Sequence, residues 1–262
     1  MLDFGGGSPM LLRRVIEHFR RQEWTAIGID FVIVVLGVFV GVQAATWNEA
    51  RNDRMRAHSY LERIHADLET DLDNYRGRIA FWGVVSEYGR DGLAYAETGN
   101  ADGASQWRLL LSYFQAGQLA EYFTTSVTYD ELKSAGELHL IGDVGLRNQL
   151  AGYYINAANP VLTERPAYRM HVRGIIPLDV QDYIWANCYS SDATQQQVLV
   201  DCVSPVSEAR AAAIVNTIRS DRALMSELRY WMSTMHVAAL IGRDRQERAE
   251  QLVAAVEAAQ ER

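Results

Sequence analysis

Lysine and cysteine are almost absent from this 262-residue sequence. Lys133 is the single lysine among 25 basic residues, and such heavy use of arginine is typical of a GC-rich, bacterial genome. Positive charge is also in deficit, because 33 acidic residues give a formal net charge of -8. A general nucleic-acid binder needs a basic face to neutralise phosphates, so the composition predicts no nucleic-acid partner.

Recognisable catalytic motifs are absent as well. The sequence contains no HExxH, GxSxG, Walker A or GxGxxG pattern. His58, Glu62, His65 and Glu69 do share one face of a predicted helix, a spacing that can hold a divalent metal ion. The same face serves as readily as a solvated polar side. We therefore assign no catalytic residue, no cofactor and no metal, and we expect that the protein is not an enzyme.

A long apolar run near the N-terminus is the strongest signal in the sequence. Residues 27–45 contain one charge, Asp30, and Phe31–Val42 is uninterrupted. A helix needs about 20 mainly apolar residues to span a bilayer, and Trp24 and Trp47 bracket the run as interfacial anchors do. On the insertion scale the apolar side chains contribute about -5 kcal/mol, which outweighs a cost of about 3 kcal/mol for Asp30.

A buried core helix and a cleaved signal peptide are the two other interpretations of this run. A soluble fold would have to cover an unusually long valine-rich face. Val42–Ala44 loosely resembles a cleavage site, but the run exceeds the usual length of about 7–15 residues, and helical periodicity continues past Ala45. We favour a retained transmembrane helix over residues 24–47.

Charge and cysteine content together predict the orientation of this helix. Four arginines precede the span and three follow it closely, which is a weak positive-inside bias. Cys188 and Cys202 are the only cysteines, and an even count in an exported domain favours a disulfide; two unrelated buried thiols are the alternative. We expect a bacterial inner-membrane protein with a cytoplasmic amphipathic tail (residues 1–23) and a periplasmic domain (residues 48–262).

One face of the predicted span combines polar and small residues. Helical spacing brings together Asp30, Gly37, Gly41, Ala44 and Asn48. Glycines four positions apart let a second helix approach closely in lipid, and an ionisable group inside a membrane suggests a function. We expect this face to bind a second copy of the chain or another membrane protein. A chance pattern, with Asp30 facing the lipid headgroups, is the alternative.

Amphipathic helical periodicity dominates the rest of the chain. Apolar residues recur every three to four positions from Leu61 to Ile79 and again over residues 221–260. Shorter helices are expected over residues 106–123, 128–140, 143–158, 179–186 and 207–219. Residues 187–205 look like a loop pinned by a disulfide, with one short strand over 197–203. The pattern predicts an all-α protein whose transmembrane helix continues into a helical bundle, with the post-membrane and C-terminal helices antiparallel.

Residues 26–68 and 128–154 follow a recognisable pattern. The first block has an acidic residue early in the span, two glycines, W-N-E-x-R and Y-L, at Asp30, Gly37, Gly41, Trp47, Asn48, Glu49, Arg51, Tyr60 and Leu61. The second has T-Y-x-x-L-K-x-x-G-x-L, at Thr128, Tyr129, Leu132, Lys133, Gly136 and Leu138. These blocks resemble a family of bacterial single-span, membrane-anchored proteins of unknown function. The resemblance implies a topology and no activity, and it does not include the cysteines.

These features favour a membrane-anchored periplasmic interaction protein, either an accessory or scaffold subunit of a membrane complex or a homodimeric sensor. The tail before the span is too short for an enzymatic output domain, which favours the accessory role. An anchored periplasmic enzyme or a ligand-binding module is the alternative. It would need a pocket with converging polar groups, for which Tyr129, Lys133 and His139 are the candidates.

Overall fold

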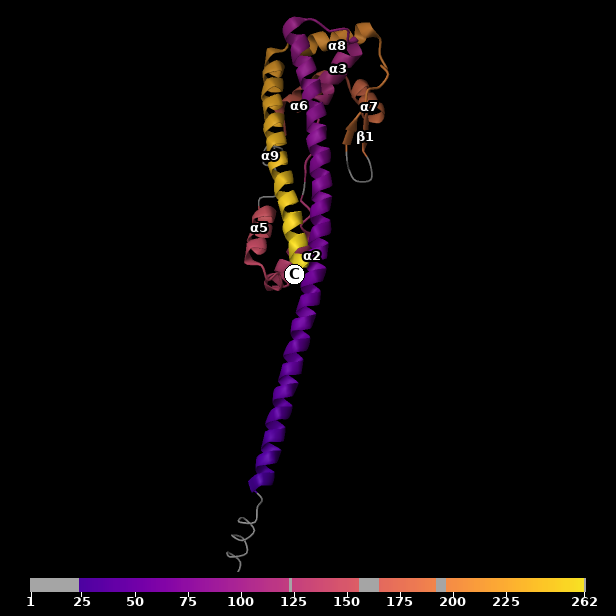
Figure 1. Ribbon diagram of the computed structural model, residues 1–262. Helices are drawn as coiled ribbons and strands as arrows, with labels where there is room; N and C mark the ends of the chain where they lie inside the picture. The colour runs from indigo at the N-terminus through magenta and orange to yellow at the C-terminus, as the bar shows by residue number, and fades with distance from the viewer. Residues whose placement is uncertain (1–23, 123, 156–164, 192–196, 262) are drawn as a thin grey trace, which may run out of the picture. The chain divides into compact units, whose positions relative to one another are not determined.

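The computed structural model describes residues 24–122, 124–155, 165–191 and 197–261 (Figure 1). Within these residues it contains eight α-helices, one 3-10 helix and one two-stranded sheet. The all-α fold class predicted from the sequence is therefore confirmed. The chain divides into two compact units, residues 1–56 and 57–262.

The longest helix, α2 (Trp24–Thr98), supplies the described part of the first unit. It is the one helix in the described chain that is long and apolar enough to cross a membrane. Every side chain from Gly28 to Asn52 is exposed, so no other part of the described chain covers the apolar run. The helix continues past Trp47 without a break, as the periodicity predicts.

The second unit contains the remaining elements. They are α3 (Gln106–Gln115), α4 (Val127–Ser134), η1 (Leu138–Leu140), α5 (Val144–Ile155), α6 (Ala167–Ile175), α7 (Leu178–Asn187), β1 (Tyr189–Ser191), β2 (Gln197–Leu199), α8 (Glu208–Ser220) and α9 (Arg222–Gln260). Side-chain caps begin several of these helices. Ser207 accepts a hydrogen bond from the backbone N–H of Arg210, and Asp221 accepts one from that of Leu224.

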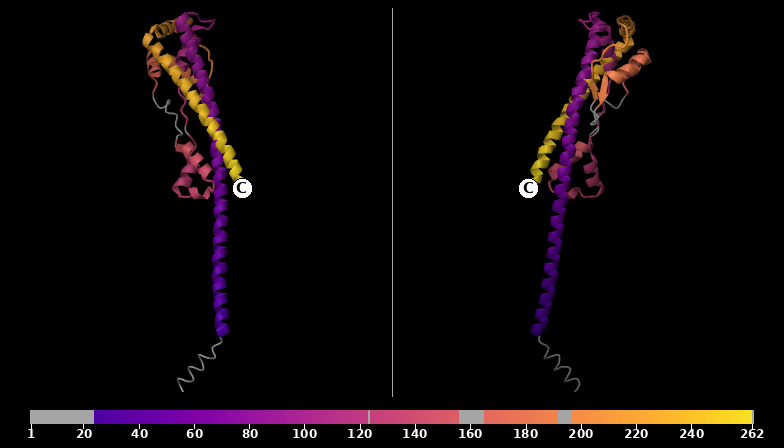
Figure 2. Two further views of the ribbon diagram at one scale, coloured as in Figure 1. Left: turned by 60° about the vertical axis from the view of Figure 1, so that its left-hand side comes forward. Right: turned by 90° about the vertical axis from the view of Figure 1, so that its right-hand side faces the viewer.

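An antiparallel helix pair, α9 and the part of α2 beyond residue 56, is the framework of this unit (Figure 2). Gly242 of α9 lies against Trp82 and Ile79 of α2, and Gly89 of α2 lies against the side chain of Met232. The residue numbers of the contacts therefore increase along α2 while they decrease along α9, as they do in an antiparallel pair. The antiparallel pairing predicted from the sequence is confirmed.

Buried apolar side chains form two clusters along this pair. In the first, Trp82 and Trp231 lie among residues of α3, α6, α7 and α8. In the second, Leu68 and Leu150 lie among residues of α4, α5 and the C-terminal half of α9. Ile79 packs against both clusters, so a single pair of helices supports the whole core of the unit.

The helix predicted over residues 106–123 is shorter in the structure, because α3 covers only its first part. Beyond α3, Trp231 and Trp82 donate their indole N–H groups to the carbonyl oxygens of Ala116 and Ala120, at 2.9 and 3.1 Å. Buried side chains satisfy these carbonyls in place of helical N–H groups. The chain can therefore leave the helix without losing backbone hydrogen bonds.

Residues 128–140, predicted as one helix, form α4 and η1 with a turn between them. Gly136 has a φ of +72°, in the left-handed region that favours glycine. The N–H groups of Gly136 and Glu137 bond back to the carbonyls of Lys133 and Leu132, at 3.1 and 3.0 Å. This is the Schellman arrangement that ends helices, so Gly136 stops α4.

The sequence predicts neither α6 nor β1. Residues 189–191 pair antiparallel with β2, with Ser190 opposite Val198, so the expected short strand has a partner. The end of the helix predicted over 143–158 lies outside the described residues beyond Ile155. The helix predicted over 179–186 is confirmed as α7, and those over 207–219 and 221–260 are confirmed as α8 and α9.

Gly242→Val tests the close contact between α9 and α2. A Cβ atom at this position would lie 2.9 Å from the ring of Trp82 and 3.1 Å from a side-chain carbon of Ile79. Trp82 is buried and hydrogen-bonded, so it cannot move freely, and the unfolding free energy should fall by about 1–3 kcal/mol. Urea unfolding of the full-length protein in detergent, followed by near-UV circular dichroism, measures the loss.

Gly83→Ala is the matched control, because nothing lies within 4 Å of its Cβ position on α2. The alanine should raise the unfolding free energy by about 0.5–1 kcal/mol through helix propensity. An equal loss in both variants would contradict the close contact at Gly242.

Candidate functional site

The predicted interface residues of the span all lie on α2, where their spacing places them on one face. Asp30, Gly37, Gly41, Ala44 and Asn48 are all exposed. Apart from the adjoining residues and backbone of α2 itself, no described atom lies within 4 Å of the point where a Cβ would stand on either glycine. The face is therefore open to the close approach of another helix.

The end of the apolar run carries groups suited to a membrane interface. Trp47 is exposed, and the guanidinium of Arg51 lies 5.9 Å from the centroid of its ring. The hydroxyl of Thr46 donates to the carbonyl oxygens of Val42 and Gln43, at 3.1 and 3.0 Å, so this hydroxyl is paired within the helix. The side chain of Trp24 and the predicted tail, residues 1–23, lie outside the described residues.

The second block of the family pattern docks on α2 through two carboxylates one turn apart. Asp71 accepts a hydrogen bond from the backbone N–H of Thr125 at 2.8 Å. Asp67 accepts one from the backbone N–H of Thr128, in the first turn of α4, at 3.3 Å. Carboxylates favour the N-terminal end of a helix, where backbone N–H groups lack helical partners. These bonds fix where α4 begins.

Three further pattern residues have packing or backbone roles. The ring of Tyr129 stacks on that of Tyr154, with centroids 4.5 Å apart. Leu132 is fully buried in the second core cluster, and Gly136 ends α4. The two blocks of the pattern also touch each other, because the hydroxyl of Tyr60 donates to Glu137 at 2.9 Å.

Lys133, in contrast, has no role inside the fold. Its side chain is exposed and makes no hydrogen bond or ion pair with any described residue. His139 is also exposed, with its Nδ1 atom 3.2 Å from the carbonyl oxygen of Gly136. Tyr129 is buried, so these three residues do not share an enclosed surface.

A buried polar cluster surrounds Asp71. Its carboxylate is fully buried and also accepts a hydrogen bond from the hydroxyl of Tyr153 at 2.7 Å. Burial raises the pKa of Asp71, whereas the hydrogen bonds from Tyr153 and Thr125 act in the opposite direction. The rings of Tyr75 and Tyr122 lie 4.1 Å apart in the same cluster. The cluster links α2 and α5 to the segment between α3 and α4, and its hydrogen bonds hold these parts of the fold together.

Cys188 and Cys202 lie at disulfide distance, with Cα atoms 5.2 Å apart. The predicted pairing of the two cysteines therefore has the required geometry. Cys188 is fully buried, and its carbonyl oxygen accepts a hydrogen bond from the N–H of Val200 at 3.1 Å. The carbonyl of Cys202 accepts one from the indole of Trp107 at 2.9 Å. The pair thus ties the β1–β2 hairpin to the first core cluster.

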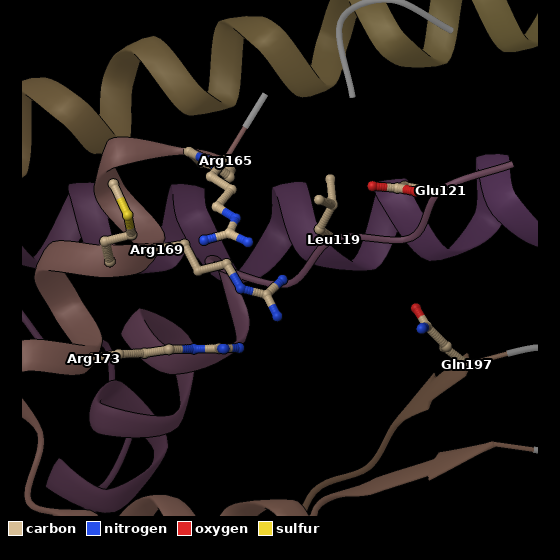
Figure 3. A pocket seen from close by; sticks show the side chains of 8 residues that line it. Leu119, Glu121, Arg165, Arg169, Arg173 and Gln197 are labelled. Carbon is tan, nitrogen blue, oxygen red and sulfur yellow. The ribbon is translucent and has the colours of Figure 1, made fainter. Parts of the chain in front are cut away.

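The sequence analysis missed a set of three arginines, Arg165, Arg169 and Arg173, that line one cleft (Figure 3). Their spacing of four positions is a signal that the sequence does contain. This spacing places side chains on one face only if the segment is helical, and the sequence did not predict the helix α6.

The histidines and glutamates of the polar face on α2 form separate pairs. His58 lies 3.4 Å from Glu62, and His65 lies 3.2 Å from Glu257 of α9. Among the described residues no three His, Cys, Asp or Glu side chains are placed to hold a metal ion.

Comparison of the chain with protein-family models, with curated proteins and with solved structures gives no match.

Asp71→Asn should change how stability depends on pH. The pKa of Asp71 is higher in the folded protein than in the unfolded chain, where it is near 4. Protonated Asp71 therefore contributes its full stabilisation below the unfolded-state pKa. This contribution is lost as pH rises through the folded-state pKa. The unfolding free energy of the wild type should therefore decline relative to Asp71→Asn as pH rises from about 4 to neutrality. Urea titrations at several pH values measure the difference.

Two further variants complete this test. Asp71→Ala leaves the Tyr153 hydroxyl and the Thr125 N–H without an acceptor and should cost about 1–3 kcal/mol. Asp182→Asn, at an exposed position on α7, should match the wild type at every pH. Parallel pH curves for the wild type and Asp71→Asn would contradict the raised pKa.

Replacing both Cys188 and Cys202 by serine should lower the unfolding free energy by about 3 kcal/mol, because the bridge closes a loop of about 15 residues. Thermal unfolding without reductant measures the loss, and dithiothreitol should destabilise the wild type but not the double variant. Alkylation of wild-type protein denatured without reductant should label neither cysteine. Two labels under that condition would show that the thiols are free.

Proposed function

We propose that this protein is a single-pass inner-membrane protein whose span binds another membrane protein, and that it serves as an accessory or scaffold subunit. The open face of α2 around Gly37 and Gly41 is the observation that carries the proposal. Lipid tails fill such a surface poorly, whereas a second helix can pack against the exposed backbone. Asp30 on the same face gains most from a partner that offers a hydrogen bond, because ionisable groups are costly in lipid.

The proposed topology has the N-terminus in the cytoplasm and residues 48–262 in the periplasm. The positive-inside bias of the sequence supports it. The cysteine pair at disulfide distance adds support, since disulfides persist in oxidising compartments such as the periplasm. The resemblance to single-span, membrane-anchored proteins points to the same arrangement.

A homodimeric sensor is the second form of this proposal, because a small-residue face can also bind its own copy. An anchored enzyme is less well supported, since Tyr129 is buried in a stacked pair while Lys133 and His139 lie exposed.

The double variant Gly37→Ile and Gly41→Ile should abolish association of the span while leaving membrane insertion intact. Isoleucine fills the space that a partner helix would occupy, and it keeps the segment apolar. The full-length protein is purified from native membranes in mild detergent, and the proteins that co-purify are identified. Resistance to alkaline carbonate extraction checks insertion.

Val35→Ile with Val42→Ile is the matched control, because these positions lie on the opposite face of the same helix. A membrane protein retained by the wild type and the control but lost from the glycine variant supports the accessory role. A homodimer with no other partner would favour the sensor form. Identical co-purification from all three would refute the interface.

A further inference from the structure

A cleft of about 500 Å³ lies between α6 and the start of β2 (Figure 3). Arg169 and Arg173 line it from successive turns of α6, and Arg165 lines it from just before the helix. Gln197 and Glu121 lie across from the arginines. Three positive charges and one negative charge therefore border a single cleft.

Two aromatic rings pack against the guanidinium of Arg173. Its guanidinium carbon lies 4.9 Å from the ring centroid of Trp185 and 5.2 Å from that of Phe114. Both rings belong to the packing of the first core cluster. Stacking of this kind fixes the plane of a guanidinium while leaving its edge free to donate hydrogen bonds.

A chain of buried amides holds the other side of Arg173. One of its terminal nitrogens donates to Oε1 of Gln118 at 3.3 Å. Gln118 in turn donates to Oε1 of Gln115 at 2.9 Å, and Gln115 donates to the carbonyl oxygen of Cys188 at 3.0 Å. Gln115 and Gln118 are both buried. Arg173 is thus preorganised, and its order does not depend on a ligand.

No described carboxylate pairs with the arginines of the cluster. Arg165 and Arg169 make no hydrogen bond or ion pair with any residue that the structure describes. Burial lowers the pKa of Arg169, and burial together with the charge of Arg169 lowers the pKa of Arg173 to about 10. Half-buried like charges repel one another strongly because little water screens them.

Several exposed arginines elsewhere in this acidic chain form ion pairs with carboxylates, although others, such as Arg222 and Arg243, have no partner among the described residues. Arg63 pairs with Glu131, and Arg210 pairs with Asp179 at 3.0 Å. The cleft differs in gathering three arginines at one place, in a chain that has an excess of carboxylates and a formal net charge of -8. A cluster left without such partners can instead be neutralised by a bound anion.

Two polar atoms at the cleft also lack partners. The Nε atom of Arg173 and the Oε1 atom of Gln197 are both buried and make no hydrogen bond in the described chain. The first is a donor and the second an acceptor. Both atoms are closed to solvent, so a ligand reaches them only when these side chains shift, and it then needs an anionic oxygen and a group such as a hydroxyl that can donate.

We propose that this cleft binds a small soluble organic anion that carries two or more oxyanion charges, as carboxylates or as a phosphate. Planar guanidinium forks match the geometry of both groups. The cleft volume suits a metabolite-sized molecule rather than a polymer. Arg169 and Arg173 bind the oxyanions, Arg165 adds charge at the rim, and Gln197 accepts a hydrogen bond from a ligand hydroxyl. This site is independent of the span and of its partner.

Isothermal titration calorimetry of the full-length protein in neutral detergent tests the proposal. Citrate and glycerol 3-phosphate are the two probes, and acetate is the monovalent comparison. At least one probe should bind with a Kd of about 1 mM or tighter. Tighter binding of citrate assigns carboxylates as the ligand groups, and tighter binding of glycerol 3-phosphate assigns a phosphate.

Arg169→Gln should weaken this binding by about tenfold or more, because it removes a charge-assisted contact. Arg169 has no partner among the described residues, so the variant should keep the wild-type melting temperature without ligand. Arg165→Gln, at an exposed position, should also weaken binding. This second variant keeps the test valid if Arg169→Gln disturbs folding. Arg243→Gln removes the same charge from an exposed position on α9 and should not change the Kd.

Three results would overturn the anion site. The first is no heat of binding for either probe up to about 10 mM. The second is an unchanged Kd in both Arg169→Gln and Arg165→Gln, and the third is acetate binding as tightly as the two probes. None of these results bears on association of the span, which the glycine variants test separately.

Discussion

The close antiparallel contact between α9 and α2 is the constraint on which the rest of the second unit depends. Gly242 lets α9 approach within contact distance of Trp82, and no larger residue fits there without displacing a buried ring. Both core clusters are built against this pair. The short helices α3 to α8 cannot bury their apolar faces on one another alone, so their positions follow from the contact.

Sequence periodicity predicted the elements whose pattern is long and local. The repeat from Leu61 to Ile79 and the C-terminal repeat extend over many turns, so both helices are evident without a structure. The helix α6 is short and lies between Pro166 and Pro177, and its amphipathic face has too few turns to be evident from the sequence. The arginine cleft depends on the placement of α6 next to β2, two elements that are distant in sequence, so no periodic pattern predicts it.

The sequence pattern over residues 128–138 has different physical causes at different positions. A carboxylate of α2 accepts a hydrogen bond from the N–H of Thr128 in the first turn of α4, and Gly136 ends this helix in a left-handed turn. The pattern itself is visible in the sequence. Its causes are not, because the partners Asp67 and Asp71 lie more than 50 residues earlier in the chain and only the fold brings them to α4. Lys133 alone has no explanation within the fold, since its side chain is exposed and unpaired among the described residues.

The chain of buried amides behind Arg173 has a fixed polarity. The guanidinium at one end can only donate, and the carbonyl of Cys188 at the other end can only accept. Neither glutamine can therefore rotate its amide alone, because a single flip would place two N–H groups or two oxygens face to face. Both side chains are locked in one orientation by groups that are themselves unable to reverse, and this corner of the core has a single hydrogen-bonding state.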